Sequence, residues 1–92
     1  MKFITHYTFA PGVRDEVLRR FHETGGQPPS GVRMLGRWHA ASGNEGWVLS
    51  ETDDVLAQSE WILGWSDHLE FRITPVTDDE EFVEVLRRVN PE

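Results

Sequence analysis

The chain has 92 residues, no cysteine and a formal net charge of −7, with 16 acidic residues against 9 Lys and Arg. The length predicts a single domain over residues 1–92, because one core serves a chain of this size and a second would lack residues. The missing cysteines exclude disulfide bonds, thiolate nucleophiles and cysteine-ligated metal centres. The acidic balance argues against nucleic acid as a partner, since phosphate binding needs a basic surface.

The sequence also lacks long apolar stretches. A membrane span needs about 20 apolar residues and a signal peptide needs an apolar block of about 7–15. Neither pattern occurs here, so we expect a cytoplasmic protein with no membrane partner.

The first half of the chain predicts a strand, a helix and a hairpin. Residues 2–9 alternate between two faces, as a half-buried strand does. Apolar residues then recur at helical spacing until Gly25 and Gly26, which favour the left-handed conformation that ends helices. A second strand is expected over residues 32–40 and a third over 46–51, joined by a turn-forming segment.

The second half predicts a helix, a strand and a final helix. Residues 52–54 supply N-cap oxygens for a helix whose apolar side carries Trp61 and Trp65, which we expect to be core residues. A fourth strand starts at residue 69, and Pro75 either ends it or places it at the sheet edge. Residues 77–80 match a capping box, with a Thr77 hydroxyl at the N-cap and Glu80 at N3. The apolar stripe of the final helix is Phe82, Val85, Leu86 and Val89.

The order β-α-β-β-α-β, followed by an extra C-terminal helix, predicts an α+β ferredoxin-like fold with a four-stranded antiparallel sheet. Both first helices should cover one face of the sheet. The helix-facing set is Phe3, Tyr7, Phe9, Leu69, Phe71 and Ile73. The opposite face should carry Ile4, His6, Thr8, Glu70, Arg72 and Thr74. A one-residue slip exchanges the faces of a strand, so the pattern leaves open whether Trp38 or His39, and Trp47 or Val48, joins the open face.

Four sequence blocks occur in order along nearly the whole chain. They are MKFITHYTF with PG and RDEV in residues 1–17, GVRMLGRWH at 31–39, GWVLSETDD at 46–54 and FRITPVTDDEE at 71–81. In these blocks the chain resembles a family of short, uncharacterised bacterial proteins, a domain of unknown function within the dimeric α/β-barrel superfamily. The resemblance implies a homodimer in which two sheets pair face to face around a cleft.

The activities found in that superfamily are diverse. Members include cofactor-independent monooxygenases, haem-degrading enzymes, chlorite dismutase-like proteins and muconolactone isomerase-like proteins, so the fold alone assigns no function. The haem-degrading members use a histidine ligand together with Asn and Trp. Here His6 stands where that pattern would place Asn, and His68 follows the second helix, so the set does not match. We expect no cofactor.

The residues predicted to share the open face suggest a ligand site. His6 can act as a general base or a polar anchor, since imidazole titrates near neutral pH, although an ordinary strand histidine is the simpler interpretation. Arg72 can hold an anionic group or pair with Glu51, Glu70 or a partner-chain carboxylate. The predicted catalytic residue is His6. The predicted ligand-binding residues are Arg72, Trp38, His39, Trp47 and Glu51.

The acidic clusters at residues 53–54 and 78–81 are explained by helix capping, and the four histidines show no metal-ligand spacing, so no metal site is predicted. Two hypotheses follow. The protein binds a small organic ligand on the open sheet face of a homodimer, with proton transfer or cofactor-independent oxygenation if it is an enzyme. Alternatively, it is a structural or regulatory dimer module without a ligand cavity.

Overall fold

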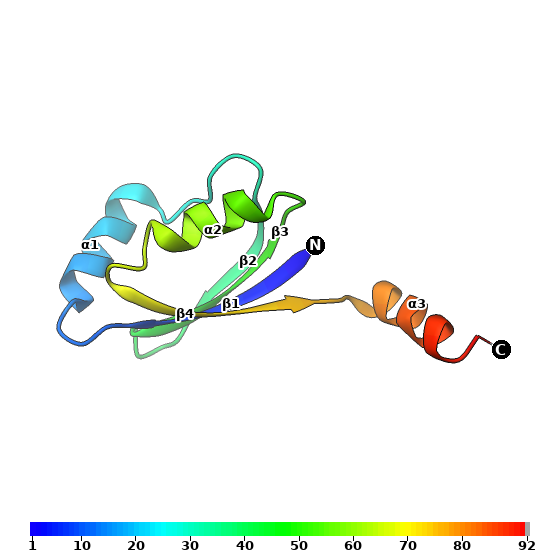
Figure 1. The fold of residues 1–92 in the computed structure, drawn as a ribbon. Coiled ribbons are helices and arrows are strands. Elements are labelled where there is room, and N and C mark those ends of the chain that lie inside the picture. The colour runs from blue at the N-terminus through cyan, green and yellow to red at the C-terminus, as the bar shows by residue number, and fades with distance from the viewer. Residues whose placement is uncertain (92) are drawn as a thin grey trace.

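The computed structural model describes residues 1–91. Its elements in chain order are β1 (Lys2–Phe9), α1 (Arg14–Thr24), β2 (Arg33–His39), β3 (Glu45–Glu51), α2 (Val55–Leu63), β4 (Leu69–Val76) and α3 (Asp79–Val89). The strands form one antiparallel sheet in the order β2-β3-β1-β4. α1 and α2 cover one side of this sheet, and α3 projects past the end of β4 (Figure 1). The predicted ferredoxin-like fold with its extra helix is confirmed.

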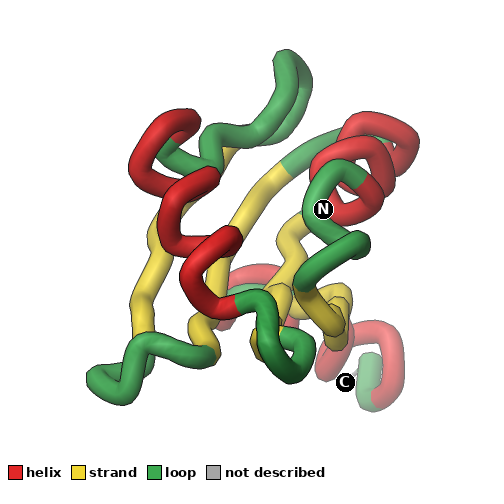
Figure 2. Tube along the Cα trace, turned by 90° about the vertical axis from the view of Figure 1, so that its left-hand side faces the viewer, coloured by secondary structure: helices red, strands yellow, loops and turns green. Residues whose placement is uncertain are grey.

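The end of α1 and the start of α2 lie where the sequence signals predict. Gly25 follows α1 at φ 70°, a left-handed conformation in which its N–H donates to the Phe21 carbonyl. At the start of α2, the Asp54 carboxylate accepts hydrogen bonds from the N–H groups of Leu56 and Ala57. These contacts satisfy backbone groups that a helix end leaves without partners. Figure 2 shows the two helices in red beside the yellow strands.

The start of α3 corrects one prediction. A capping box is present, but the N-cap is Asp78 and the N3 residue is Glu81, one position later than the predicted Thr77 and Glu80. Both arrangements offer an oxygen at the N-cap and a carboxylate at N3. An aspartate accepts this hydrogen bond as well as a threonine does, so the sequence alone could not separate the two registers.

Pro75 illustrates how the sheet edge tolerates an imino acid. β4 continues through Pro75 to Val76 and lies at the edge of the sheet, next to β1 only. A proline at a sheet edge removes no inter-strand hydrogen bond when its nitrogen is on the side of the strand that has no neighbouring strand. The edge position, one of the two alternatives read from the sequence, is therefore the correct one.

The hairpin register settles which residues share each face. Trp38 pairs with Trp47, and His39 pairs with Gly46. On β1, His6 pairs with Trp47, so both tryptophans lie on the face of His6. Directly opposed residues in an antiparallel pair share a face of the sheet. Trp38 and Trp47 therefore belong to the open face, whereas His39 and Val48 face the helices.

The core is small and lies between the sheet and the two covering helices. Its buried apolar residues are Phe3, Val17, Val32, Val48, Ala57 and Leu69. Polar side chains enter the same layer: Ser50 donates a hydrogen bond to Gln58 across it, at 3.1 Å. A core of this size leaves much apolar surface outside, and the overall extent of 55 × 28 × 18 Å reflects an elongated molecule.

Candidate functional site

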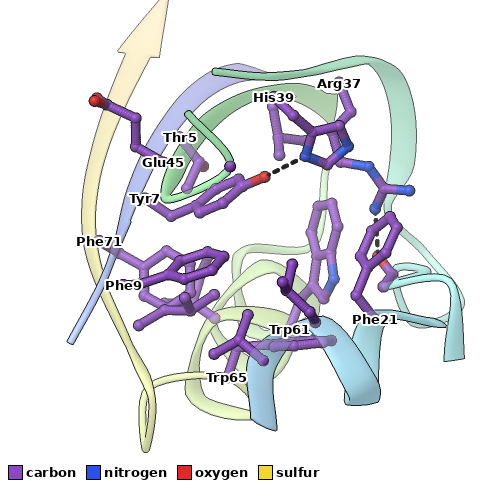
Figure 3. Close-up of a pocket in the computed structure, with 17 residues that line it drawn as sticks. Thr5, Tyr7, Phe9, Phe21, Arg37, His39, Glu45, Trp61, Trp65 and Phe71 are labelled. Atoms are coloured by element: carbon purple, nitrogen blue, oxygen red, sulfur yellow. Dashed lines mark hydrogen bonds between the residues drawn. The ribbon is translucent and has the colours of Figure 1, made fainter. Parts of the chain in front are cut away.

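A cavity of about 250 Å³ lies between the sheet and the two helices (Figure 3). α1 and α2 form one wall, and the helix-facing residues of the strands form the other. The residues that line the cavity are Thr5, Tyr7, Phe9, Val17, Leu18, Phe21, Gly26, Arg37, His39, Gly43, Glu45, Val48, Trp61, Ile62, Trp65, Leu69 and Phe71. We call this space the helix-side cavity.

Aromatic rings make up much of the wall. Trp61 and Trp65 reach in from α2 and the segment that follows it, and both are half-buried. They were predicted to be core residues, and they border a space instead of filling it. The Arg20 guanidinium lies 5.1 Å from the ring of Trp65 and binds the Asp67 carboxylate through two hydrogen bonds. These contacts hold the end of the wall that follows α2.

The polar groups of the cavity include a tyrosine from β1 and a histidine from β2, which meet across the intervening strand β3. The Tyr7 hydroxyl lies 2.9 Å from His39 Nδ1, and the His39 ring meets Phe21 edge-on with centroids 5.3 Å apart. Gly46 makes room for this pair. A Cβ atom at position 46 would overlap the Tyr7 hydroxyl and lie 2.7 Å from the carbonyl oxygen of Trp38.

This pair joins the cavity to solvent. His39 is exposed, whereas Tyr7 is half-buried. Burial raises the pKa of the Tyr7 phenol, and the nearby positive charge of Arg37 lowers it by less. The phenol therefore stays protonated at neutral pH. Through its hydrogen bond to His39 it can pass a proton between the cavity and solvent, as acid–base chemistry requires.

Arg37 supports the wall and is not free to bind an anion. Its guanidinium donates to the carbonyl oxygens of Gly25 and Gly26, at 2.9 and 3.0 Å, and lies 4.7 Å from the Phe21 ring centroid. Arg37 of β2 thus binds the left-handed turn that ends α1. These contacts position α1 against the sheet.

Thr5 supplies the most buried polar atom of the cavity. The residue is 2% exposed, and its Oγ1 has no hydrogen-bond partner within residues 1–91. A buried hydroxyl without a partner costs free energy, about 1–3 kcal/mol. A hydroxyl of this kind beside a cavity is where a water molecule or a polar group of a ligand can supply the missing hydrogen bond.

Four of the residues predicted for a site lie together on the other face of the sheet. Trp38, Trp47, His6 and Arg72 are successive cross-strand partners, so they form one row across all four strands. His6 Nε2 lies 2.9 Å from Glu45 Oε1, and its ring stacks on Trp47 with centroids 5.2 Å apart. We call the face that carries this row the open face.

The other two predicted residues lie elsewhere. His39 lines the helix-side cavity, as described above. Glu51 is on the open face, two rows away from His6, where it forms ion pairs with Arg33 and Lys2. Within the part of the chain that the structure describes, Arg72 has no ion pair, so neither Glu51 nor Glu70 holds it. The roles predicted for these side chains stay predictions.

Residues 1–91 contain neither a metal-binding cluster nor a membrane-spanning helix. No group of three or more His, Asp or Glu residues within that range is placed to hold a metal ion. Among the same residues, no helix is both long and apolar enough to cross a membrane. The cytoplasmic location remains a prediction.

Residues 1–90 match the family described as a domain of unknown function, DUF3303. The chain belongs to this family. The resemblance read from the four sequence blocks is thereby confirmed. No curated protein matches the chain in sequence.

Solved structures with similar folds include PA3566 from Pseudomonas aeruginosa, which is 13% identical, with a TM-score of 0.55 over 84% of this chain and 91% of that chain. Rv0793 from Mycobacterium tuberculosis is 14% identical, with a TM-score of 0.51 over 85% and 95% of the two chains. An uncharacterized NIPSNAP domain protein from Burkholderia xenovorans is 15% identical, with a TM-score of 0.47 over 86% and 97%. The first two likenesses support the fold, and no function follows from them.

Sequence reasoning missed the helix-side cavity. Strand alternation already placed Tyr7 on the helix-facing side, and a buried tyrosine hydroxyl usually has a hydrogen-bond partner. A search for that partner could have led to His39. The contribution of Arg37 depends on the bulge and register of the hairpin, which carry no local signal.

Proposed function

We propose that the protein binds a small, neutral aromatic molecule in the helix-side cavity. One observation carries the proposal: an aromatic-walled cavity of about 250 Å³ is lined by Thr5, whose buried hydroxyl has no partner in residues 1–91. Apolar walls around a few placed polar groups are the usual composition of small-molecule sites. The proposal moves the ligand from the open face, where the sequence suggested it, to the opposite face.

The size of the cavity indicates a ligand of one or two rings. A cavity of about 150 Å³ accepts benzene. Sites for drug-sized ligands begin at about 300 Å³. The helix-side cavity, at about 250 Å³, lies between these limits.

The polar groups favour a neutral ligand with a hydroxyl or carbonyl group. The Arg37 guanidinium is bonded to two carbonyl oxygens, and the Glu45 carboxylate is bonded to His6. A charged ligand would lose its hydration without gaining a free counter-charge, which is unfavourable. A ring hydroxyl or carbonyl can instead bond to Thr5 in the interior or to the Tyr7–His39 pair near solvent.

The test is calorimetric titration with 2-naphthol, naphthalene and 2-naphthoate. We expect 2-naphthol to bind most tightly and the carboxylate least. Thr5→Val should weaken the binding of 2-naphthol by about tenfold, because the variant keeps the shape of the side chain and removes one hydrogen bond. It should leave the affinity for naphthalene unchanged. Thr8→Val is the matched control, since Thr8 lies on the same strand but faces away from the cavity. Equal losses in the two variants would contradict the proposal.

We also propose that the chain forms a homodimer through the open face. Ile4 is 41% exposed there, Trp38 is 58% exposed and Trp47 is 39% exposed. Contiguous apolar surface of this kind is typical of protein interfaces. A wild-type protein that sediments as a monomer at high micromolar concentration would contradict this part. A dimer that binds none of the three ring compounds would support the alternative of a dimer module without a ligand.

A further inference from the structure

The C-terminal helix α3 has no place in the body of the fold. Every one of its residues is exposed, and it lies beyond the end of β4, away from α1 and α2 (Figure 1). Three residues of its apolar stripe, Phe82, Val85 and Leu86, are 53%, 39% and 51% exposed. Isolated helices shorter than about 12–15 residues are marginal in water. An 11-residue helix with an apolar stripe therefore needs a surface to pack against.

Ion pairs hold α3 in this extended position. Lys2 Nζ lies 3.0 Å from Asp78 Oδ2 and 3.5 Å from Glu81 Oε1. These contacts tie the first turn of α3 to the start of β1, and only Thr77 and Asp78 separate the helix from β4. The radius of gyration is 15.6 Å. A compact chain of this length would have about 12 Å. The helix leads away from its own sheet and does not cover it.

The open face is the second uncovered apolar surface of the chain. Trp38 and Trp47 stand side by side there as cross-strand partners, and Ile4 lies one row away. Within residues 1–91, no helix packs on this side of the sheet. One chain thus carries an apolar helix stripe without a surface, and an apolar sheet face without a helix.

We propose that α3 is an exchanged arm: the apolar stripe of α3 in each copy packs on the open face of the other copy. The inference rests on the proposed homodimer and names the partner's α3 as the segment that covers the open face around Trp38 and Trp47. A two-fold axis pairs each surface with its complement twice, as a closed dimer demands.

The charges of the two surfaces fit each other. α3 is acidic in its first turn and ends with Arg87 and Arg88, while the open face carries exposed Glu70 beside exposed Arg72. The partner's Glu70 therefore offers an opposite charge to Arg87 and Arg88 at the end of the arm. The polar side of α3 carries Glu80 and Glu84, where a helix that binds a membrane surface carries Lys and Arg. A second copy is the occupant that these features fit.

Sedimentation velocity tests the arm with two variants, one that disrupts the stripe of α3 and one that disrupts the open face. The arm variant carries Phe82→Glu with Leu86→Glu, and the face variant carries Trp38→Glu with Trp47→Glu. Each variant alone should raise the dimer dissociation constant at least about 100-fold, because both arm-to-face contacts of its homodimer are disrupted. An equimolar mixture should recover a heterodimer, since the intact arm of one variant meets the intact face of the other. Glu80→Gln with Glu84→Gln, on the polar side of α3, is the control and should dimerise like wild type.

Each failure of this experiment has a distinct meaning. An arm variant that dimerises as tightly as wild type overturns the exchange and leaves the sheet-paired dimer standing. A face variant that dimerises normally, or a mixture that stays monomeric, also overturns the exchange. A monomeric wild type overturns the arm together with the homodimer. The proposed ligand site is judged separately, by the 2-naphthol titration.

Discussion

The two faces of the β-sheet carry similar side chains in different surroundings. On the helix-covered face, the Tyr7 phenol meets His39 at the mouth of a cavity. On the open face, His6 stacks on Trp47 and meets Glu45, with Trp38 exposed beside them. Both faces therefore hold a histidine, aromatic rings and a polar partner. One face borders a cavity and the other exposes its apolar side chains, a difference that residue composition does not record.

The largest expected contrast between the faces is at neighbouring positions of β4. Phe71 lines the cavity, and Phe71→Ala should lower the free energy of unfolding by about 3 kcal/mol, at the low end for a phenylalanine because the residue is half-buried. Arg72→Ala, on the open face, should change it by less than about 0.5 kcal/mol. Urea unfolding measures both. Equal effects would show that the two faces are not distinct.

Glycine positions sharpen the same contrast. Gly46→Ala should cost about 2 kcal/mol and separate Tyr7 from His39, because the added methyl group meets the tyrosine and a backbone carbonyl. Gly36→Ala meets only the ring of Trp38, which is exposed and can move aside, so a cost below about 0.5 kcal/mol is expected. Thermal unfolding measures the stability of both variants, and the NMR signal of His39 reports whether its contact with Tyr7 is kept. A larger effect at position 36 would contradict the packing described.

Helix caps compare the body of the fold with α3. Asp54→Ala removes the N-cap of α2, which packs on the sheet, and should lower the free energy of global unfolding by about 1 kcal/mol. Asp78→Ala removes the N-cap of α3, which does not pack on the body. It should reduce the circular dichroism signal of helix and weaken dimerisation. The free energy of unfolding of residues 1–76, measured at protein concentrations below the dimer dissociation constant, should stay the same. A loss of body stability in Asp78→Ala would place α3 within the fold.

The smallest effect concerns an ion pair beside the cavity. Two hydrogen bonds from Arg20 lower the pKa of the Asp67 carboxyl from 3.8 to about 2. A lowered pKa adds stability above the unfolded-state value, and this part is lost as the pH falls from about 4 to about 2. Asp67→Asn should therefore flatten the dependence of the urea midpoint on pH in that interval. An unchanged slope in Arg20→Gln, which removes the same two hydrogen bonds from the other side, would contradict this assignment.

Local signals in the sequence were enough for most of the fold. Alternation in β1 and β4 assigned their faces, the glycines after α1 marked its end, and residues 52–54 marked the start of α2. The capping box of α3 was misplaced by one residue, because Thr77 and Asp78 offer equivalent oxygens. The face of the hairpin residues was left open, since side-chain facing depends on pairing between strands distant in sequence.

The candidate site was harder to derive, for a physical reason. His6 and Arg72 were predicted to share the open face, and the structure places them in one row with Trp38 and Trp47, whose facing the sequence left open. Whether a cavity exists depends on how tightly α1 and α2 pack on the sheet, which is a property of volumes in three dimensions. The partnerless hydroxyl of Thr5 likewise becomes visible only when every neighbouring donor and acceptor is known.

The most direct test of the central claim is to locate the ring of 2-naphthol by NMR. Methyl groups report each face separately: Val48 and Leu69 line the helix-side cavity, whereas Ile4 and Leu49 lie on the open face. We predict intermolecular nuclear Overhauser effects from the naphthol protons to Val48 and Leu69. Effects to Ile4 and Leu49, with none to the cavity methyl groups, would contradict the account and return the ligand to the open face.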